Sequence, residues 1–356
     1  MENMRSTRTY RDGDEEGIFN LIKAVYPSMP WNRDQWMRFW HWMYQENPAG
    51  PAKIYLVEEQ GKIVAHRAHI LVDLKVGNEI MKACQNIDFM VHPDSKYRGL
   101  FLLERRALRE AEEEGLHISF GFPTVAARPG FMKAGYFEIA FMRPMIKFFN
   151  LKNVVQTRIH NKYLAKLCAV TASPLLRTIY RARTSPAIEG LKITQVPSFD
   201  DRVNELWAKV SDSHQIIRVR SKQYLDWRYG APDVEYTIYL AEKGEVVLGY
   251  IVLRCAQLDT FKQGRIYDIV GYTEEIIHCL VSKAVEHFRK EGADCVYCNM
   301  LANETHFRAL KNNGFISAPF TKRSWFGAYS SAPSIPKASV EDYRNWFIQL
   351  GDSDLI

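Results

Sequence analysis

The sequence predicts an α/β protein in which one plan of helices and mixed-sheet strands occurs twice. In both halves Trp-x-Tyr is followed by a proline-containing loop and then by Ile-Tyr-Leu, starting at Trp42 and at Trp227. Each half then continues with a long helix, a short apolar strand, a short helix and a last strand. Helices and strands that alternate in this way are typical of a mixed sheet flanked by helices, and the repetition indicates two such units.

The strands that open each unit are predicted as a hairpin. Ile-Tyr-Leu begins a strand that ends at a charged turn with glycine, Gly61 in one half and Gly244 in the other, and a second β-rich strand follows. The long helices are expected to end at Gly115 and Gly292, because glycine just past a helix end is the usual stop. The short helix of each half ends at a further glycine.

The repeat divides the chain into four parts. Residues 1–150 and 191–330 hold the two copies. Residues 151–190 are basic, with sparse apolar residues at helical spacing, and we expect a helical connector there rather than a membrane-surface helix. Residues 331–356 carry aromatic side chains that we expect to pack on the body of the protein.

Composition bounds the class of protein. The chain has 356 residues, a net charge of +6, 47% hydrophobic and 25% charged residues, as an ordinary globular protein has. Interleaved charges argue against nucleic acid as a partner, and no apolar run reaches the length of a membrane span, so a cytoplasmic protein is expected. Cys295 and Cys298 lie on a predicted strand and point to opposite faces, so no metal site is expected.

The segment VHPDSKYRGLF connects an apolar strand to the first long helix. Lys96 and Arg98 stand just before that helix, where the helix dipole disfavours positive charge. A bound anion would remove the conflict, because the first helical amides also point outward. We therefore expect a phosphate or pyrophosphate here. The helix is expected to bury Leu103 and Ala107 and to turn Glu104 largely towards solvent.

This segment resembles the acyl-CoA loop of the GNAT superfamily of N-acyltransferases, usually written [RQ]-x-x-G-x-[GA]. Here Lys96 takes the first position and Phe101 the last. The stretches FGFPTVAARPGFMKAGY, YLDWRY and NWFIQLGDSD are similar to a two-domain subgroup of that family. The resemblance covers nearly the whole chain and implies tandem GNAT-like domains, each a twisted mixed β-sheet flanked by helices.

The resemblance also implies a donor site, with acetyl-CoA as the expected co-substrate. Pantetheine would pair with the strand backbone at Phe89, Met90 and Val91. The diphosphate would bind at Lys96, Tyr97, Arg98, Gly99, Leu100 and Phe101. Many members use a tyrosine of the short helix as general acid, and Phe131 stands at the matching position here.

Asp88 is the candidate general base, since a carboxylate within an apolar strand either faces a cleft or needs buried partners. A structural role is the alternative, because Asp268 recurs at the matching place in the second copy. There Thr273, Glu274 and Glu275 begin the helix, and two carboxylates would repel a pyrophosphate. We expect the second copy to bind no CoA and to pack against the first.

These observations predict an acyl-CoA-dependent N-acyltransferase whose first copy is active, with direct transfer to an amine of a small molecule or an amino sugar. The aromatic residues between Trp31 and Tyr44 are expected mostly in the core, with an acceptor pocket as the alternative. Two other functions stay open. One is a non-catalytic CoA-binding or interaction module, and the other is an aminoacyl or peptidyl transferase with paired domains.

Overall fold

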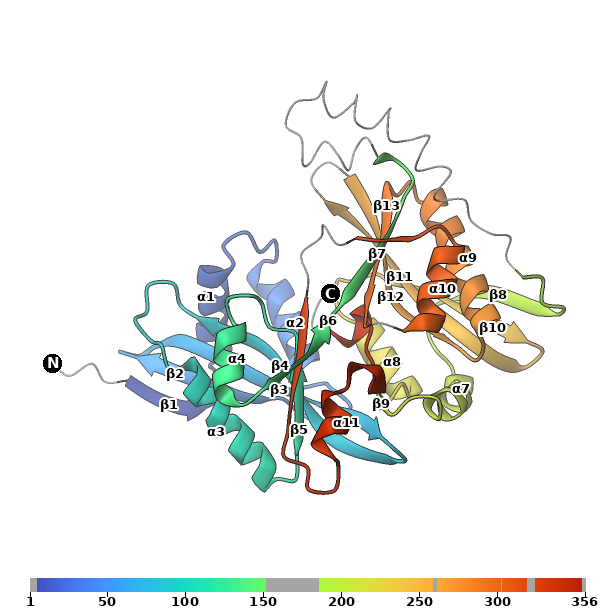
Figure 1. Cartoon of the computed structure of the whole chain (residues 1–356). Helices are drawn as coiled ribbons and strands as arrows, with labels where there is room; N and C mark the ends of the chain where they lie inside the picture. The colour runs from blue at the N-terminus through green and yellow to red at the C-terminus, as the bar shows by residue number, and fades with distance from the viewer. Residues whose placement is uncertain (1–4, 152–185, 259–260, 302, 319–323, 354–356) are drawn as a thin grey trace.

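The computed structural model describes residues 5–151, 186–258, 261–301, 303–318 and 324–353. These residues form two mixed sheets with helices packed against them (Figure 1), which confirms the predicted fold class. The expected connector falls almost wholly outside the described residues. Within the described ranges, no helix is both long and apolar enough to cross a membrane.

The elements follow the order that the repeat predicts. The first half contains β1 (Arg5–Thr9), α1 (Glu15–Val25), α2 (Arg33–Tyr44), β2 (Lys53–Glu59), β3 (Lys62–Val76), β4 (Glu79–Val91), α3 (Leu100–Glu113), β5 (Ile118–Gly121), α4 (Arg128–Ala134), β6 (Phe137–Phe141) and β7 (Arg143–Phe148). The second half contains β8 (Leu191–Val196), α7 (Arg202–Ser211), β9 (Ile216–Arg218), α8 (Lys222–Tyr229), β10 (Thr237–Lys243), β11 (Val246–Leu258), β12 (Phe261–Gly271), α9 (Glu274–Lys290), β13 (Cys295–Met300), α10 (Glu304–Asn312), β14 (Ile316–Ser317) and β15 (Trp325–Ser330). The tail adds α11 (Lys337–Glu341), η1 (Tyr343–Asn345), β16 (Trp346–Phe347) and η2 (Leu350–Asp352).

Both predicted hairpins are present. Gly61 turns β2 into β3 at φ 76°, and Gly244 turns β10 into β11 at φ 59°. Positive φ values of this kind favour glycine. The registers also match, because Tyr55 pairs with Arg67 in the first hairpin and Tyr239 pairs with Ile251 in the second.

Helices cover both faces of the first sheet. Apolar side chains of α1 and α2 pack on one face, in a cluster that includes Ile18, Trp36, Trp40, Trp42, Ile54 and Ala68. The helix α3 packs on the other face, in a cluster that includes Leu103, Ala107, Tyr55, Val57 and Ala65. The aromatic residues of α2 are thus mostly core residues, as expected. Apolar side chains of α3 and α4 fix where the loops that precede these helices lie.

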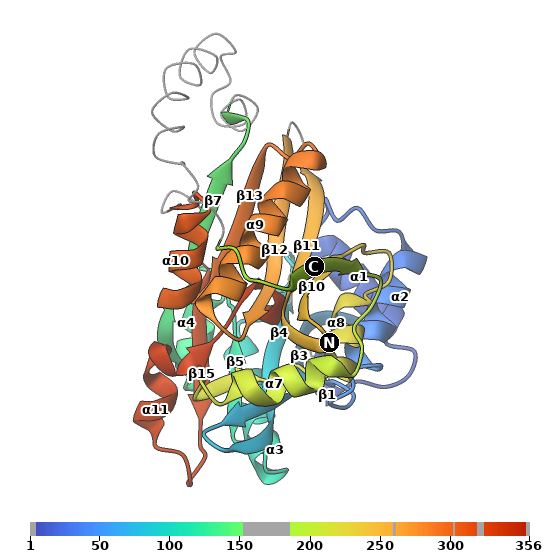
Figure 2. The ribbon, with the colours of Figure 1, turned by 90° about the vertical axis from the view of Figure 1, so that its right-hand side faces the viewer.

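The first half contributes β7 to the second sheet, and the second half contributes β9 and β15 to the first sheet. The first sheet runs β1-β2-β3-β4-β5-β15-β6, with β9 paired to β3, and the second runs β14-β7-β13-β12-β11-β10-β8. Figure 1 shows β7 leaving β6 to enter the second sheet, and Figure 2 shows β15 beside β5. The division into units at 150 and 191 stays a prediction, since the sheets interlock across it.

The repeated tryptophans meet between the halves. The ring centroids of Trp42 and Trp227 lie 4.9 Å apart in a stacked arrangement. The indole N–H of Trp42 donates to the Trp227 carbonyl (2.8 Å), and that of Trp227 donates to the Trp42 carbonyl (2.9 Å). Equivalent residues therefore make the same contact in both directions, so the two copies face each other about a local pseudo-twofold axis.

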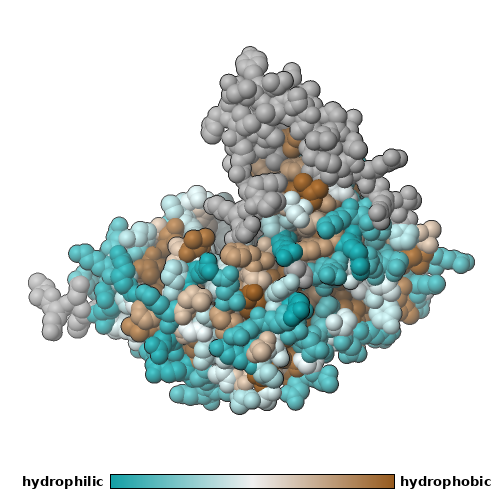
Figure 3. All heavy atoms as spheres, viewed as in Figure 1, coloured by the Kyte–Doolittle hydropathy of each residue, from teal (hydrophilic) through white to brown (hydrophobic). Residues whose placement is uncertain are grey.

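From residue 346 to residue 353, the tail lies in the interior of the protein. Trp346 and Phe347 form β16, which pairs in parallel with β9, and both side chains are buried. On the face shown in Figure 3, apolar residues occur in small separate groups among polar ones.

Candidate functional site

The first sheet opens between β4 and β5. These parallel strands pair at Cys84, Gln85 and Asn86, where Asn86 meets Gly121, and no pair follows in the described residues. Beyond Asn86, β4 continues to Val91 and stays paired with β3. The strands therefore diverge after their last pair and leave one edge of β4 exposed to a ligand.

Backbone alternation shows which groups face the opening. The amide of His92 donates to the Val64 carbonyl (2.8 Å), in register with the pair of Met90 and His66. In an antiparallel ladder, the residues between such pairs direct N–H and C=O away from the partner strand. Phe89 and Val91 therefore present their backbone groups towards the opening, as the pantetheine prediction requires.

A cavity of about 730 Å³ lies at this opening. Residues from four segments line it, namely Val25 and Tyr26 at the end of α1, Phe89–Val91 of β4, the loop and start of α3, and the stretch from Thr124 to Lys133. Most of the predicted donor residues meet there: Phe89, Met90, Val91, Tyr97, Arg98, Leu100 and Phe101. Asp88, Lys96 and Gly99 are outside this lining, so their predicted roles remain predictions.

At the N-terminus of α3, neither a capping side chain nor an acidic residue satisfies the first helical amides. Gly99 is its N-cap, no side chain caps the first turn, and that turn carries no acidic residue. Arg98 lines the cavity and donates to the carbonyls of Ser95 and Tyr97 (both 3.0 Å). A Cβ on Gly99 would lie 2.9 Å from the Tyr97 ring, so only glycine fits the loop as it stands. Outward amides and a nearby guanidinium are the groups that bind anions at helix starts, and the diphosphate site predicted at this loop stays a prediction.

Lys133 adds a second cation that the sequence analysis did not single out. It lies on α4, lines the cavity, and its ammonium is 5.7 Å from the centroid of the Phe101 ring. No pattern in the sequence of the short helix predicts that Lys133 faces the loop after β4. Lys96, in contrast, does not line the cavity.

Asp88 occupies a bulge in β4. Its φ is 48°, which non-glycine residues rarely adopt, and two β4 residues, Asp88 and Phe89, stand opposite Arg67. The carboxylate accepts a hydrogen bond from the Tyr44 hydroxyl, and the carbonyl accepts one from His66 Nδ1 (2.8 Å). The bulge therefore sits immediately before the open edge and helps to direct it.

The expectation that Glu104 faces solvent is wrong. Its side chain is fully buried and forms a bidentate ion pair with Arg67 of β3, with Nη2 to Oε1 at 2.6 Å. The predicted apolar stripe of α3 contained a signal, since Glu104 lies one turn from Leu100 and Leu108. A charge within such a stripe needs a buried partner.

Phe131 is buried against the cavity wall. Its ring meets Phe89 edge-on, with centroids 5.1 Å apart, and packs on Tyr136 and Trp325. The tyrosine acid that the resemblance would place here is therefore replaced by an apolar aromatic. His66 and His69 lie on opposite faces of β3, one beside Tyr44 and the other beside Glu104.

The matching helix start in the second half, that of α9, which the structure describes, carries a threonine cap and acidic residues. The Thr273 hydroxyl caps α9 by accepting from the Ile276 amide (3.4 Å), and Glu274 pairs with Arg308 (2.7 Å). The carboxylate of Glu275 is also in the first turn, and hydrogen bonds to its own amide and to Thr273 lower its pKa. The negative charge expected from the sequence is present.

The tail fills the matching opening in the second sheet. The strands β12 and β13 pair for the last time at Ile266 and Cys298. Beyond that point, Gln349 Oε1 accepts from the Ile269 amide (3.0 Å) and Nε2 donates to the Ile269 carbonyl (2.8 Å). Ile269 follows Asp268 as Phe89 follows Asp88. No local pattern in the sequence predicted this contact.

The two cysteines of the CxxC motif are buried core residues. Cys298 packs in a cluster with Ile266 and Leu310, whereas Cys295 packs with Ile146 and Ala318. Burial raises the pKa of both thiols, that of Cys295 to about 11. Among the described residues, no group of metal-ligating side chains is present.

Comparisons with known proteins agree with this geometry. Residues 6–139 match the family described as Acetyltransferase (GNAT) domain, which confirms the predicted resemblance. No curated protein matches the chain. A probable N-acyltransferase from Enterococcus faecalis has a similar fold, with a TM-score of 0.64 and 11% identity over 91% of this chain and 72% of its own.

Two further solved structures share the fold. A GCN5-related N-acetyltransferase from Anabaena variabilis gives a TM-score of 0.63 and 12% identity over 91% of this chain and 72% of its own. Saccharomyces cerevisiae N-myristoyltransferase, solved with myristoyl-CoA and inhibitors, gives 0.60 and 12% identity over 92% of this chain and 80% of its own. These TM-scores show a shared fold over nearly the whole chain, and at such low identity they show the fold alone.

Proposed function

Because residues 6–139 match the GNAT acetyltransferase domain family, we propose that this chain transfers an acyl group from a CoA thioester to an amine, with the first half as the active one. Acetyl-CoA is the proposed donor. The proposed acceptor is an amine of a small molecule or of an amino sugar. The donor cavity at the opening between β4 and β5 is the proposed place of reaction.

One internal comparison carries this proposal. In the second half, a primary amide, that of Gln349, bonds both the N–H and the C=O of Ile269 at the opening. In the first half the equivalent backbone groups belong to Phe89, which lines the cavity instead. Pantetheine contains two secondary amides that can make the same pair of bonds. The protein therefore exhibits, at its second opening, the kind of contact proposed for CoA at the first.

The chemistry requires the amine nitrogen to attack the thioester carbonyl carbon. The new C–N bond forms as the C–S bond breaks, and the amine proton must leave. Backbone N–H groups at the open edge of β4 would stabilise the negative charge on the carbonyl oxygen. The amides at the start of α3, with Arg98 and Lys133, would hold the diphosphate. The CoA thiolate would leave and take up a proton from solvent, because Phe131 offers none.

Asp88 is the proposed general base. Its carboxylate is partly exposed on the strand that carries the open edge, and the Tyr44 hydroxyl orients it. A carboxylate acts on an amine either directly or through one ordered water. Phe131 favours a second candidate function, a CoA-binding module without turnover.

Calorimetry with acetyl-CoA tests the donor site. Arg98→Glu places a carboxylate beside the amides of α3, so we expect the affinity for acetyl-CoA to fall by about tenfold or more. Lys96→Glu makes the same change outside the cavity and should have a smaller effect. Lys192→Glu, on exposed β8, is the control and should bind as the wild type does.

Release of free thiol from acetyl-CoA, followed with a panel of amines and amino sugars, then separates the two functions. Turnover supports the transferase, and tight binding without turnover supports the module. Longer acyl-CoAs in the same assay define the acyl group. A folded wild-type protein that does not bind any of these thioesters would refute both candidates.

A further inference from the structure

A set of buried polar side chains lies between the first sheet and α3. It comprises residues of β3, β4, α3 and β5 and one residue just after α4, here named the polar core: Arg67, His69, Asn86, Glu104, Ser119 and Tyr136. None of the six side chains is more than 4% exposed. None lines the donor cavity, yet each comes from an element that borders or supports it.

Hydrogen bonds connect the polar core. Arg67 holds Glu104 through two bonds, and the Tyr136 hydroxyl donates to the Glu104 carboxylate (2.7 Å). The same hydroxyl lies 2.7 Å from Ser119 Oγ and accepts from Asn86 Nδ2 (3.2 Å). His69 Nε2 is 3.4 Å from Glu104. Tyr136 is thus the point at which α3, β4 and β5 are joined.

The internal repeat identifies the matching positions in the second half. In the two hairpins, Arg67 pairs with Tyr55 and Ile251 pairs with Tyr239, so Ile251 is the equivalent of Arg67. Two residues further along the same strands, Leu253 is the equivalent of His69. The parallel strands of the first half pair for the last time at Asn86 and Gly121, and those of the second half at Ile266 and Cys298. Ile266 is therefore the equivalent of Asn86. The same register matches Ser119 to Val296.

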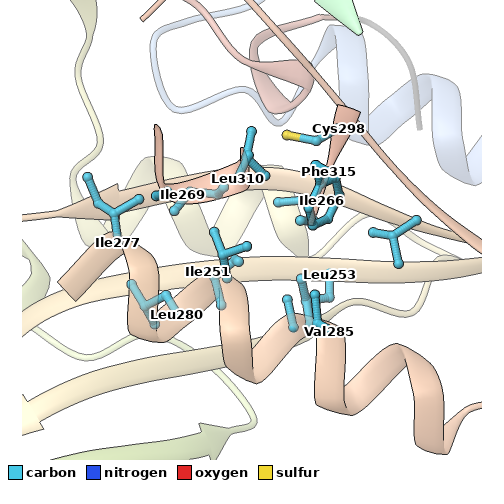
Figure 4. Packing of buried hydrophobic residues seen from close by; sticks show 14 of the residues in the cluster. Ile251, Leu253, Ile266, Ile269, Ile277, Leu280, Val285, Cys298, Leu310 and Phe315 are labelled. Atoms are coloured by element: carbon cyan, nitrogen blue, oxygen red, sulfur yellow. The ribbon is translucent and has the colours of Figure 1, made fainter. Parts of the chain in front are cut away.

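The helices complete the match. Glu104 and Val281 lie at the same distance before the glycines, Gly115 and Gly292, that end the two long helices. Tyr136 follows Gly135 as Phe315 follows Gly314. All six equivalents are apolar and belong to one buried cluster: Ile251, Leu253, Ile266, Val281, Val296 and Phe315. Figure 4 shows four of them, Ile251, Leu253, Ile266 and Phe315, packed together.

The fold itself does not require the polar core. An apolar cluster supports the same arrangement of strands and helix in the second half, so a buried ion pair is dispensable for this architecture. Buried ion pairs often stabilise a protein less than apolar residues of similar volume. Hydrogen bonds, however, are directional, and they specify distances and angles that apolar contacts leave free. The polar core occurs in the half that carries the donor cavity.

We propose that the polar core is a positioning network that fixes the start of α3 and the open edge of β4 relative to each other, which deepens the proposed function and rests on it. Asn86 is the last β4 residue paired with β5, so its bond to Tyr136 sets where the strands part. Glu104 lies one turn after Leu100, so holding Glu104 holds the helix start that faces the diphosphate. Donor binding then requires little rearrangement.

The single substitution Tyr136→Phe tests the network, because it installs the residue of the second half and removes only the central hydroxyl. We expect the affinity for CoA, measured by calorimetry, to fall by about tenfold. Amide hydrogen exchange at Phe89 and Val91, measured without ligand, should become faster. Tyr250→Phe is the matched control, since it removes a buried tyrosine hydroxyl that donates to Asp268 (3.0 Å) in the second half. It should leave both readouts unchanged.

A transplant provides the second test. Arg67→Ile, Glu104→Val and Tyr136→Phe, combined with His69→Leu, Asn86→Ile and Ser119→Val, give the first half the six apolar residues of the second. The variant should unfold at the same or a higher temperature and still bind CoA weakly. Wild-type affinity and exchange in both variants would overturn the network. A wild-type protein that binds no CoA would refute the proposed function, while exchange at Phe89 and Val91 would still decide whether the network holds the open edge.

Discussion

Asp88 and Asp268 occupy the same place in the two halves, yet their surroundings differ. Tyr44 and Tyr229 are also equivalent, and each donates to its aspartate. Asp268 is buried and also receives hydrogen bonds from Arg220, Tyr250 and Gln349. Burial accordingly raises the pKa of Asp268. Asp88 keeps partial exposure, so the recurrence of the Tyr–Asp bond does not by itself remove Asp88 from the chemistry.

We expect Asp88→Asn to lower kcat for acyl transfer by about 100-fold or more, with the affinity for acetyl-CoA unchanged. The amide is of similar size and still accepts from Tyr44, but it cannot take a proton from an amine. Steady-state kinetics and calorimetry measure the two effects. Asp94→Asn, an exposed carboxylate in the loop after β4, is the control. A kcat near that of the wild type would show that Asp88 has the structural role of Asp268.

At the scale of single residues, the sequence predicted which residues line the cavity better than it predicted the residues that support them. Phe89, Arg98 and Leu100 line the cavity, as the loop motif led us to expect. The polar core was not predicted, because Arg67 and Glu104 lie far apart in the chain and only the tertiary fold brings them together. Helical periodicity alone placed Glu104 on the wrong face.

At the scale of elements, α3 and α9 differ in how their first turns are satisfied. The first turn of α9 has a threonine cap and acidic residues, whereas that of α3 has neither. This difference could be predicted from the residues at the start of each helix. The contact of the tail could not be predicted, because the hydrogen bonds between Gln349 and Ile269 join two segments that meet only when both sheets have formed.

We expect Gln349→Leu to lower the free energy of unfolding by about 2–5 kcal/mol. The substitution leaves the Ile269 N–H buried without its partner, which costs about 1–3 kcal/mol. It also removes the hydrogen bonds to Asp268 and to the Ile269 C=O, which keeps His306 as a donor, at about 0.5–1.5 kcal/mol each. Urea denaturation measures the change, and exposed Gln223→Leu on α8 serves as the control. Calorimetry on the same variant should still give one donor site per chain, in the first half. A stability equal to that of the wild type would mean that water replaces Gln349 at no cost.

At the scale of the whole molecule, the repeat predicted two copies of one plan, and the structure shows that they are interlocked. Local patterns define β7 and β15 as strands but do not specify their neighbours. Strand partners are chosen by long-range packing, so the exchange of β7 and β15 could not be read from either segment alone. The exchange predicts that neither sheet unfolds without the other, because each would lose an interior strand.

Acid should reveal this coupling, since buried histidines lie where the tail joins the second half. His306 Nε2 donates to the Ile269 carbonyl (3.1 Å), and Phe347 packs on both His306 and His214. Burial lowers the pKa of His306 to about 4 and that of His214 to about 3, from 6.5. Between pH 6.5 and 4 these histidines therefore bind protons in the unfolded chain but not in the folded one, and their contribution to the free energy of unfolding falls as the pH falls.

For His306 alone the loss across this window is about 3 kcal/mol. Asp268, whose pKa burial raises, acts in the opposite direction, so the comparison of wild type with His306→Gln isolates the histidine. We expect the variant to lose less stability than the wild type between pH 6.5 and 4 in urea denaturation. Hydrogen exchange in β4 and in β12 should report one shared transition in both proteins. Separate transitions for the two sheets would contradict the interlocked unit, and equal pH dependence would contradict a neutral buried His306.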